Sequence, residues 1–432
     1  MKTYIIILDG AADRPIASLD DRTPIEAART PCLDQLAREG QQGLLTIIRQ
    51  DICPESDNGA MALLSYDPLE YYTGRGPLEG LGTGFLELSD QAVSFRINFA
   101  SYNEQEQLLD RRTARDLTED ELQALTQEIK DKVFLTGFND ITFDLVSFRH
   151  HRGIFCLRSD TLPLSGNVSN TDPGFRKDGP FGIPVDNFVP RPLKCQPLEN
   201  SQGAQNVANL VNQFVSRSRE VMNNSTINRQ RKAQGLLPAN TLLLRDGGDP
   251  PRAIPGFYEK YQRKLSFYGQ MPAEKGLVHL MGGCFTYSNP QAGEEEEDYL
   301  RRSVQQITSD PNDVIFIHLK SPDEPGHDGQ PLLKLQAIET IDRCFMAPLL
   351  QRLAPADLCV VTSDHATPCE LGIHSADAVP IILYGRSIVP DATRAFGERY
   401  AATGGLPIQR AIDLLPYVLR VENAGQAVMV AE

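Results

Sequence analysis

The pattern of apolar and polar positions predicts a mixed α/β protein. Continuous apolar runs suit parallel strands that are buried on both faces. Such runs occur at Tyr4–Leu8, at the starts of Ile315–Gln330 and Leu358–His374, and at 379–385. Apolar residues at helical spacing fill Thr23–Gly40, where an internal proline predicts a short helix or turn and then a helix that ends at Gly40. Strands that alternate with helices favour a central, mostly parallel sheet.

The pattern changes between about residues 85 and 250. Strands and a turn are predicted first, then an amphipathic helix from Thr118 with a capping box to Glu121, and later a helix over Gln205–Asn223. Leu162–Pro197 is rich in Pro, Gly, Asn and Asp, which predicts a long ordered loop or lid. We therefore predict one discontinuous α/β domain, formed by residues 1–85 and 255–432, with an α+β domain of residues 86–254 inserted into it.

Composition narrows the class of protein. The 432 residues suffice for two domains, and 41% apolar with 23% charged residues is ordinary for a globular chain. The net charge of −15 argues against nucleic-acid and membrane partners, but a local cluster of cations would still accept an anionic substrate. Eight scattered cysteines without a CxxC pair, and an N-terminal apolar run of only five residues, predict a reduced cytoplasmic protein.

Aspartate and histidine residues gather directly after the predicted strands. Three of the seven histidines of the chain are in this set, which comprises Asp9, Asp323, His327, Asp364, His365 and His374. Carboxylate and imidazole together suit divalent cations, and the carboxyl ends of parallel strands meet at one sheet edge. Two alternatives remain: Asp9 as a simple turn residue, and Asp323 with His327 as a surface pair on a helix. Pro322, Pro325 and Gly326 favour a loop over that helix.

Ser56 is placed where a helix begins, after Pro54-Glu55 and before a run of helix formers. The backbone N–H groups gathered there suit a phosphate or an activated serine oxygen, and a metal nearby would make the serine a nucleophile. Taken alone, the local sequence favours a simple N-cap over a nucleophile.

A glycine-rich stretch and a set of arginines carry further candidate chemistry. Tyr72–Gly84 holds five glycines in thirteen residues, predicts a shaped loop and matches no nucleotide-binding motif. Arg75 within it is either an anion contact or a solvated residue. Most charged residues lie on solvated faces, but basic residues of the inserted domain would suit a phosphorylated carboxylate. The candidate arginines of that region include Arg111, Arg112, Arg115, Arg158, Arg229 and Arg231.

Several motifs resemble one known family over essentially the whole chain. ILDGAADRP, PESDNGAMALLSYDP, YTGRGPLEGLGTG, DRRTAR, KSPDEPGHDG and TSDHATPCELGIHSADAVPIILYG occur in the order found in archaeal-type 2,3-bisphosphoglycerate-independent phosphoglycerate mutases, members of the alkaline phosphatase superfamily. The resemblance implies an alkaline-phosphatase-like core with an inserted phosphotransferase domain. Relatives usually read close to GSDTAH at the nucleophile, where this chain has Glu55, Asn58, Gly59 and Met61. The histidine that is lost there is not among the expected ligands, so we expect the chemistry to be intact, and its replacement to bear on the local packing and on the rate or substrate preference.

The resemblance also assigns roles. Asp323, His327 and His374 would hold one metal ion, and Asp9, Ser56, Asp364 and His365 the other. Lys275 would help to activate Ser56, and Arg111, Arg112, Arg115 and Arg229 would bind substrate. Mn²⁺, Co²⁺ and Zn²⁺ suit this ligand set, while Mg²⁺ suits three histidines less well. Neither 2,3-bisphosphoglycerate nor a nucleotide would be needed.

The function implied is the interconversion of 3-phosphoglycerate and 2-phosphoglycerate through a phosphoserine at position 56. The inserted domain would enclose the intermediate by moving on hinges near residues 85 and 250. One alternative is a related phosphotransferase or phosphatase for another hydroxy acid or amino acid, such as an ATP-dependent homoserine kinase. Another is a catalytically silent metal-binding relative. The sequence leaves the oligomeric state open, a homo-oligomer included.

Overall fold

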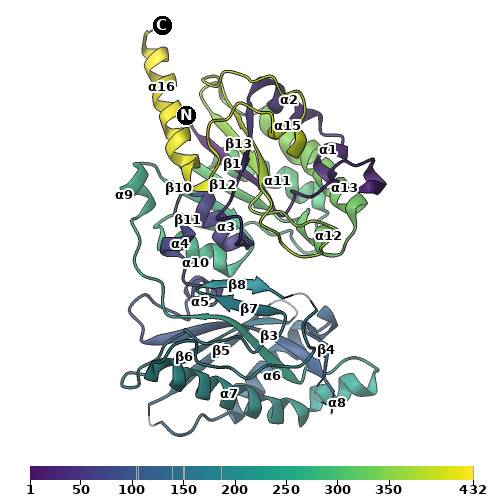
Figure 1. The fold of residues 1–432 in the computed structure, drawn as a ribbon, viewed down its shortest axis with the longest axis vertical. Coiled ribbons are helices and arrows are strands. Elements are labelled where there is room, and N and C mark those ends of the chain that lie inside the picture. Colours follow the sequence, from purple (N-terminus) through teal and green to yellow (C-terminus); the bar gives the residue numbers. More distant parts are fainter. Residues whose placement is uncertain (104, 106, 139, 149–150, 186, 432) are drawn as a thin grey trace. The chain divides into compact units, whose positions relative to one another are not determined.

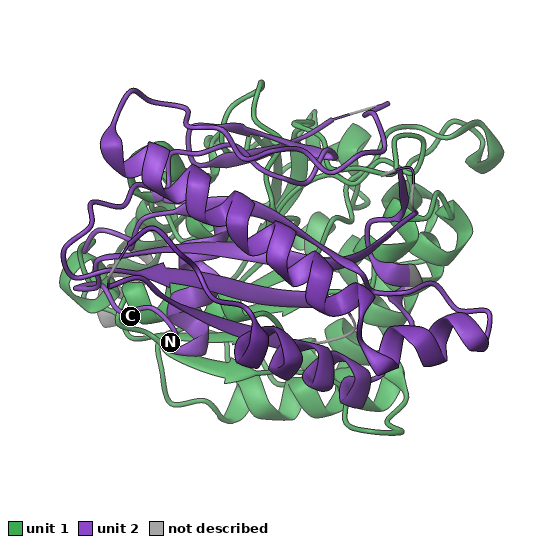
Figure 2. Ribbon diagram, turned by 90° about the horizontal axis from the view of Figure 1, so that it is seen from below, with its two compact units in different colours: residues 1–71, 254–432 green, residues 72–253 purple. Residues whose placement is uncertain are grey.

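The computed structural model describes residues 1–103, 105, 107–138, 140–148, 151–185 and 187–431, and divides the chain into two compact units (Figure 2). Unit 1 comprises Met1–Tyr71 and Ile254–Glu432, and unit 2 comprises Tyr72–Ala253. Residues 72–85, which the sequence analysis assigned to the core domain, belong to unit 2 in the structure. Within the described part of the chain, no helix combines the length and the apolar character that crossing a membrane requires.

Unit 1 is built on a seven-stranded sheet, and the predicted mixed α/β fold with a mostly parallel central sheet is confirmed (Figure 1). In spatial order the strands are β11 (Cys284–Tyr287), β10 (Leu265–Gly269), β12 (Val314–Leu319), β1 (Thr3–Leu8), β13 (Leu358–Thr362), β14 (Val379–Tyr384) and β2 (Gln41–Leu45). The first five run parallel, and β14 is antiparallel to both of its neighbours. The apolar run at β1 is continuous because all six of its residues are buried.

Helices cover the sheet of unit 1. Tyr4, Ile6 and Leu8 belong to one buried apolar cluster with residues of α2, α11 and α13. The helices of this unit are α1 (Pro24–Ala27), α2 (Pro31–Glu39), α3 (Ser56–Leu63), α4 (Pro68–Tyr71), α9 (Phe257–Tyr261), α10 (Pro272–Leu280), α11 (Glu296–Ser309), α12 (Asp323–His327), α13 (Pro331–Ile341), α14 (Ala347–Leu350), α15 (Glu398–Ala401) and α16 (Leu414–Ala431). Helices α1 and α2 match the short helix and the helix ending at Gly40 that the sequence predicted.

Three central strands bring distant parts of the chain to one sheet edge. Strand β1 lies between β12 and β13, with Leu8 paired to Leu319 and Ile7 paired to Thr362. Because the three strands run parallel, their carboxyl ends lie at the same edge of the sheet. The residues that follow them, beginning at Asp9, Lys320 and Ser363, therefore lie side by side.

Unit 2 has its own sheet and its own core. The sheet has the order β4 (Leu108–Asp110), β3 (Ala92–Tyr102), β6 (Arg152–Arg158) and β5 (Thr142–Phe148), and β9 (Thr241–Gly248) also pairs with β3. Helices α6 (Glu119–Lys132) and α7 (Gln202–Asn223) share a buried cluster with alternate β3 residues from Val93 to Phe99. The predicted capping box of Thr118 with Glu121 is present at the start of α6. Helices α5 (Arg75–Thr83) and α8 (Thr226–Ala233) and the hairpin β7 (Phe175–Asp178) and β8 (Phe181–Pro184) complete the unit.

The glycine-rich stretch forms a helix, so the predicted loop at Tyr72–Gly84 is wrong. Helix α5 spans Arg75–Thr83, and Gly84 ends it in the left-handed conformation. A Cβ atom at Gly76 would lie 2.6 Å from backbone oxygens of Ser94 and Asp246, and one at Gly80 would lie 2.8 Å from Ser94 Oγ. The glycines allow the helix to approach strand β3 closely, and this packing outweighs their low helix propensity.

The segment Asp323–His327 is also helical, against the sequence prediction of a loop. Pro322 is the N-cap of α12, and Pro325 lies in the first turn, where a backbone N–H has no partner within the helix in any case. A Cβ atom at Gly326 would lie 2.8 Å from Thr367 O, so this glycine allows close packing on the neighbouring loop.

Candidate active site

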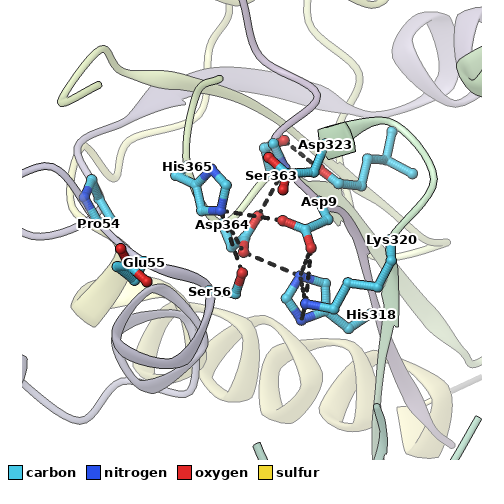
Figure 3. Close-up of polar contacts among 12 residues, drawn as sticks. Asp9, Pro54, Glu55, Ser56, His318, Lys320, Asp323, Ser363, Asp364 and His365 are labelled. Carbon is cyan, nitrogen blue, oxygen red and sulfur yellow. Dashed lines mark hydrogen bonds and ion pairs between the residues drawn. The ribbon is translucent and has the colours of Figure 1, made fainter. Parts of the chain in front are cut away.

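Ser56 is the first residue of helix α3, and its side chain is 7% exposed. The N-cap is Glu55, so Ser56 does not act as the N-cap. Ser56 Oγ lies 3.4 Å from His365 Nε2 (Figure 3). Helix α3 packs against the loop after β13 at Gly59, where a Cβ atom would lie 2.6 Å from Asp364 O. Gly59 therefore lets the serine approach the Asp364–His365 pair.

Asp9, Asp364 and His365 form a first group of ligand-type side chains at the edge formed by β1 and β13 (Figure 3). His365 Nε2 lies 3.2 Å from Asp9 Oδ1 and 3.3 Å from Asp364 Oδ2, and all three residues are buried. Gly10 N donates to Asp364 Oδ1 at 3.1 Å, which joins the two loops. Gly10 has a φ of +57°, and a Cβ atom there would lie 2.3 Å from Asp323 Oδ1, so only glycine fits.

Asp323, His327 and His374 lie in a second, neighbouring group. Asp323 Oδ2 is 3.4 Å from His327 Nε2, and Asp323 Oδ1 is 3.7 Å from His374 Nε2. The rings of His374 and His365 stack with centroids 3.7 Å apart, so the two groups adjoin. Asp323 and His327 are one turn apart on helix α12, as in the alternative of a helical ion pair. The helix does not carry them on a separate surface, however, because Asp323 also lies close to His374.

The hydrogen bonds of the three imidazoles are made through Nδ1, so each Nε2 atom is directed at a carboxylate. His327 Nδ1 lies 2.9 Å from the carbonyl oxygen of Gly372, and His374 Nδ1 lies 2.9 Å from that of Pro54. A carbonyl only accepts, so both Nδ1 atoms carry the proton. His365 Nδ1 lies 3.1 Å from Thr367 Oγ1, whose own proton is donated to Asp323 Oδ1 at 2.7 Å. Such partners orient metal-ligating histidines.

The donor set fits divalent cations. Asp9 Oδ1 and Asp364 Oδ2 are buried, and within the described residues neither accepts a hydrogen bond of normal geometry, although His365 Nε2 is 3.2–3.3 Å from both. Lone pairs that face one another at this distance require either a proton or a cation between them. Burial opposes the charged imidazole of His365, but Asp364 and Asp9 outweigh burial and raise its pKa to about 9. A metal ion would take the place of that proton.

Three residues that the sequence analysis did not select complete the cluster. His318 Nδ1 lies 2.7 Å from Glu274 Oε1, and its Nε2 lies 3.1 Å from Asp364 Oδ2. Lys320 Nζ lies 2.8 Å from Asp9 Oδ2 and 2.9 Å from Glu274 Oε1. Burial opposes the charge of Lys320, but the two carboxylates outweigh burial and raise its pKa. A histidine within the apolar run of β12 was the available sequence signal.

Lys275 does not join this cluster in the structure. It is exposed on α10, directly after the buried Glu274, and its Nζ lies 5.9 Å from the centroid of the Tyr287 ring. Among the described residues, Lys320 is the lysine that contacts Asp9.

Unit 2 gathers arginines on the face of β3 opposite its apolar core. Arg96 on β3 is paired in register with Arg245 on β9, and the next residue but one, Asn98, is paired with Arg152 on β6. Like charges directly opposite one another destabilise a sheet. Arg75 Nε lies 3.0 Å from Glu79 Oε1, and Arg96 Nη1 lies 3.7 Å from the same atom, so one carboxylate serves two guanidinium groups.

Arg96 is buried and Arg152 is half-buried, both among like charges. Arg96 Nε and Nη1 are buried and make no hydrogen bond within the described part of the protein. Burial and the neighbouring Arg75 lower the pKa of Arg152 to about 10. Burial and the adjacent arginines also lower the pKa of His151 to about 2, so this imidazole is neutral. Buried guanidinium groups gathered in this way suit an anionic ligand.

The arginines predicted for substrate differ in their positions. Arg112 is half-buried, and burial together with Arg115 and Arg111 lowers its pKa. It therefore belongs to the group of arginines in unit 2. The turn that carries it is strained, because Thr113 and Arg115 have φ values of +46° and +55°. Arg111 makes a two-pronged ion pair with Asp172, with contacts of 2.7 and 2.6 Å.

Two further arginines lie on helix α8. Arg229 is exposed there. Arg231 is fully buried and pairs with Asp116 and Glu121, so its role is in the packing of unit 2.

The fold and the site together define an α/β enzyme of a phosphoryl-transfer class, with a carboxylate–imidazole cluster that could hold divalent cations. A family model described as 2,3-bisphosphoglycerate-independent phosphoglycerate mutase matches residues 37–228. The chain is 35% identical to the mutase of that name from Aeropyrum pernix, over 90% of this chain and 92% of the relative. It is 34% identical to the one from Methanoculleus marisnigri, over 98% and 97%. The chain therefore belongs to the 2,3-bisphosphoglycerate-independent phosphoglycerate mutase family.

Solved structures agree with this assignment. A protein from Pyrococcus horikoshii is similar with a TM-score of 0.75 and 29% identity, over 98% of this chain and 97% of the other. The cofactor-independent phosphoglycerate mutase from Thermoplasma acidophilum is similar with a TM-score of 0.62 and 28% identity, over 98% and 100%. The resemblance identified from the motifs is thus confirmed.

Proposed function

We propose that this protein interconverts 3-phosphoglycerate and 2-phosphoglycerate through a phosphoserine at position 56. The observation that carries the proposal is the position of Ser56 Oγ, 3.4 Å from His365 Nε2 and beside a carboxylate–imidazole cluster suited to two divalent cations. Membership in the mutase family supports the same reaction.

The chain supplies a nucleophile and the means to orient it. Ser56 Oγ loses its proton and attacks the phosphorus of 3-phosphoglycerate; its bond to phosphorus forms, the bond from phosphorus to the 3-oxygen of glycerate breaks, and that oxygen takes up a proton. The 2-hydroxyl of glycerate then loses its proton and attacks phosphoserine, the bond from phosphorus to Ser56 Oγ breaks, and Ser56 takes up a proton again. Divalent cations, when bound, would favour the deprotonated serine and neutralise charge on the phosphoryl oxygens. The N-terminus of α3 favours negative charge at the same atom.

The ligands of the two cations are proposed as the family resemblance implies. Asp323, His327 and His374 would hold one ion, and Asp9, Asp364, His365 and Ser56 the other. Lys320 contacts the Asp9 carboxylate and His318 contacts the Asp364 carboxylate, so both would help to orient these two ligands. Mn²⁺, Co²⁺ or Zn²⁺ suits these ligands best, and the reaction uses neither 2,3-bisphosphoglycerate nor a nucleotide.

The arginine cluster of unit 2 supports a substrate with phosphate and carboxylate groups. Arg96, Arg112 and Arg152 are buried or half-buried among like charges. An anion would relieve that repulsion and supply hydrogen-bond acceptors. Excluding water protects phosphoserine from hydrolysis, and the domain closure expected from the sequence would serve this purpose. That closure and the role of Lys275 stay predictions.

The proposal is tested with full-length protein stripped of metal and reconstituted with Mn²⁺. The protein receives 3-phosphoglycerate without 2,3-bisphosphoglycerate or ATP, and ³¹P NMR follows the formation of 2-phosphoglycerate. Rapid acid quench and mass spectrometry then locate phosphate on the peptide that contains Ser56. We expect both products, and loss of both in Ser56→Ala.

Ser303→Ala is the matched control, because Ser303 is a buried helical serine whose hydroxyl donates to Tyr299 O at 2.8 Å, away from the cluster. This variant should retain activity. Activity without phosphoserine at position 56, or activity that requires ATP, would overturn the proposal; the second result would favour the kinase alternative.

A further inference from the structure

A fully buried lysine lies behind the loops that carry the proposed metal ligands. Lys334 is on helix α13, and its side chain is 0% exposed. Its Nζ donates to Thr367 O at 2.8 Å, to Asp13 Oδ2 at 2.9 Å and to Ala12 O at 3.2 Å. All three protons of the ammonium group are thus used.

The three acceptors belong to two loops that are already joined by their backbones. Thr367 N donates to Ala12 O at 3.1 Å, and Ala366 forms bridges with Ala11 and Ala12. The Asp13 carboxylate accepts from Cys369 N at 3.1 Å and from Arg14 N at 2.8 Å. Residues 11–13 and 366–369 are thus joined by backbone hydrogen bonds, and Lys334 and Asp13 add side-chain hydrogen bonds where this pairing ends.

The same two loops carry the metal ligands. The first begins at Asp9, and the second follows directly from Asp364 and His365. Thr367 is the link to both ligand groups, because its hydroxyl accepts from His365 Nδ1 and donates to Asp323 Oδ1. A shift of Thr367 would therefore turn one ligand in each group.

A buried ammonium is costly to desolvate, and the same volume is easily filled by an apolar side chain. Lys334 instead supplies three directed hydrogen bonds at the junction of the loops. We propose that Lys334 is a positioning residue that holds residues 11–13 and 366–369 in register and so sets the affinity of the centre for divalent cations. The inference rests on the metal centre proposed above.

The test compares Mn²⁺ binding by full-length, metal-stripped wild type and Lys334→Met, with free Mn²⁺ measured by electron paramagnetic resonance. Met keeps the length of the side chain and removes the three donors. Loss of an outer partner of metal ligands typically costs about 10–100-fold in metal affinity, and we expect a loss in that range. With Co²⁺, the visible absorption spectrum of the variant should also change, because it reports ligand geometry.

Two further variants separate positioning from stability. Lys260→Met removes an exposed lysine of unit 1, whose Nζ donates to Ser65 O at 2.7 Å at the opposite end of α3 from Ser56. It should lower the unfolding temperature and leave Mn²⁺ affinity unchanged. Lys334→Met/Asp13→Asn removes the uncompensated carboxylate charge, and should recover stability while Mn²⁺ binding stays weak.

The outcomes are distinguishable. If wild type itself binds no Mn²⁺, the proposed metal centre fails and this inference fails with it. If wild type binds Mn²⁺ and Lys334→Met binds it equally well with an unchanged Co²⁺ spectrum, only the role of Lys334 is overturned. Should Lys334→Met not fold, the double variant is compared with wild type by the same two criteria.

Discussion

At the scale of single residues, the orientation of each imidazole decides what the candidate centre can bind. His327 and His374 donate through Nδ1 to backbone carbonyls, and His365 donates through Nδ1 to Thr367, so all three Nε2 atoms are directed at carboxylates.

Arg96→Met tests the arginine cluster at this scale. We expect the KM for 3-phosphoglycerate to rise at least tenfold, because a charge-assisted contact to the substrate is lost. We also expect the free energy of unfolding of unliganded protein to rise by about 1 kcal/mol, because Arg96 no longer faces Arg245 across the ladder. Steady-state kinetics and urea unfolding measure the two effects.

Arg229→Met is the matched comparison, since this arginine is exposed on α8. If Arg229 contacts substrate, as the sequence predicted, its removal will raise KM as well. An unchanged KM in Arg96→Met would contradict the cluster as the substrate site.

Glu398 makes stability depend on pH. Burial raises its pKa to about 7, although Thr23 Oγ1 and Asp13 N donate to its carboxylate. An unfolded glutamate ionises near pH ~4.3, so from there to about pH 7 the folded state holds a proton that the unfolded state releases. The contribution of Glu398 to the free energy of unfolding is therefore fully present below pH ~4.3 and is lost as the pH rises through 7.

Glu398→Gln removes this dependence. Between pH 5 and pH 8 we expect wild type to lose about 2 kcal/mol of unfolding free energy relative to the variant, less than full burial would give, because the side chain is only half-buried. Urea unfolding at both pH values measures the difference. A constant difference between the two proteins would show that Glu398 does not titrate in this range.

At the scale of elements, packing overrode local preference in two places. Five glycines in Tyr72–Gly84 argued against a helix, and two prolines argued against one at Asp323–His327. Both segments are helical because glycines face a neighbouring backbone closely, and the prolines occupy positions without helical N–H partners. Sequence patterns report propensity, and they do not report which surface a helix will meet.

Gly76→Ala tests this account of α5. Alanine alone would favour the helix by about 1 kcal/mol, but its Cβ would lie 2.6 Å from two backbone oxygens. We therefore expect a net loss of about 2–3 kcal/mol in unfolding free energy. Gly256→Ala is the control, because the nearest atom to its Cβ is 3.8 Å away. A stabilised Gly76→Ala protein would contradict the close packing.

At the scale of the whole molecule, each unit has its own buried core. All proposed metal ligands belong to unit 1, and the arginine cluster belongs to unit 2. Ligand binding should therefore stabilise the two units separately.

In calorimetry of the full chain, we expect two unfolding transitions. Mn²⁺ at about 100 times its Kd should stabilise only the transition of unit 1, by about 2.7 kcal/mol. Phe155→Ala, which removes a ring from the core of unit 2, assigns the other transition because it should lower that one alone. A single transition that moves as one in both experiments would contradict independent units.

The sequence by itself determined the strands, the fold class and most of the candidate ligands, because continuous apolar runs specify buried parallel strands and their carboxyl ends must share an edge. It also placed Ser56 at a helix start. Only the tertiary structure decided that His318, Lys320, Glu274 and Lys334 support the centre, and that Lys275 lies apart from it. Such residues are recognised by what surrounds them in space. The role of a charged side chain inside an apolar pattern cannot be predicted from the sequence, because it depends on which distant segments pack against that side chain.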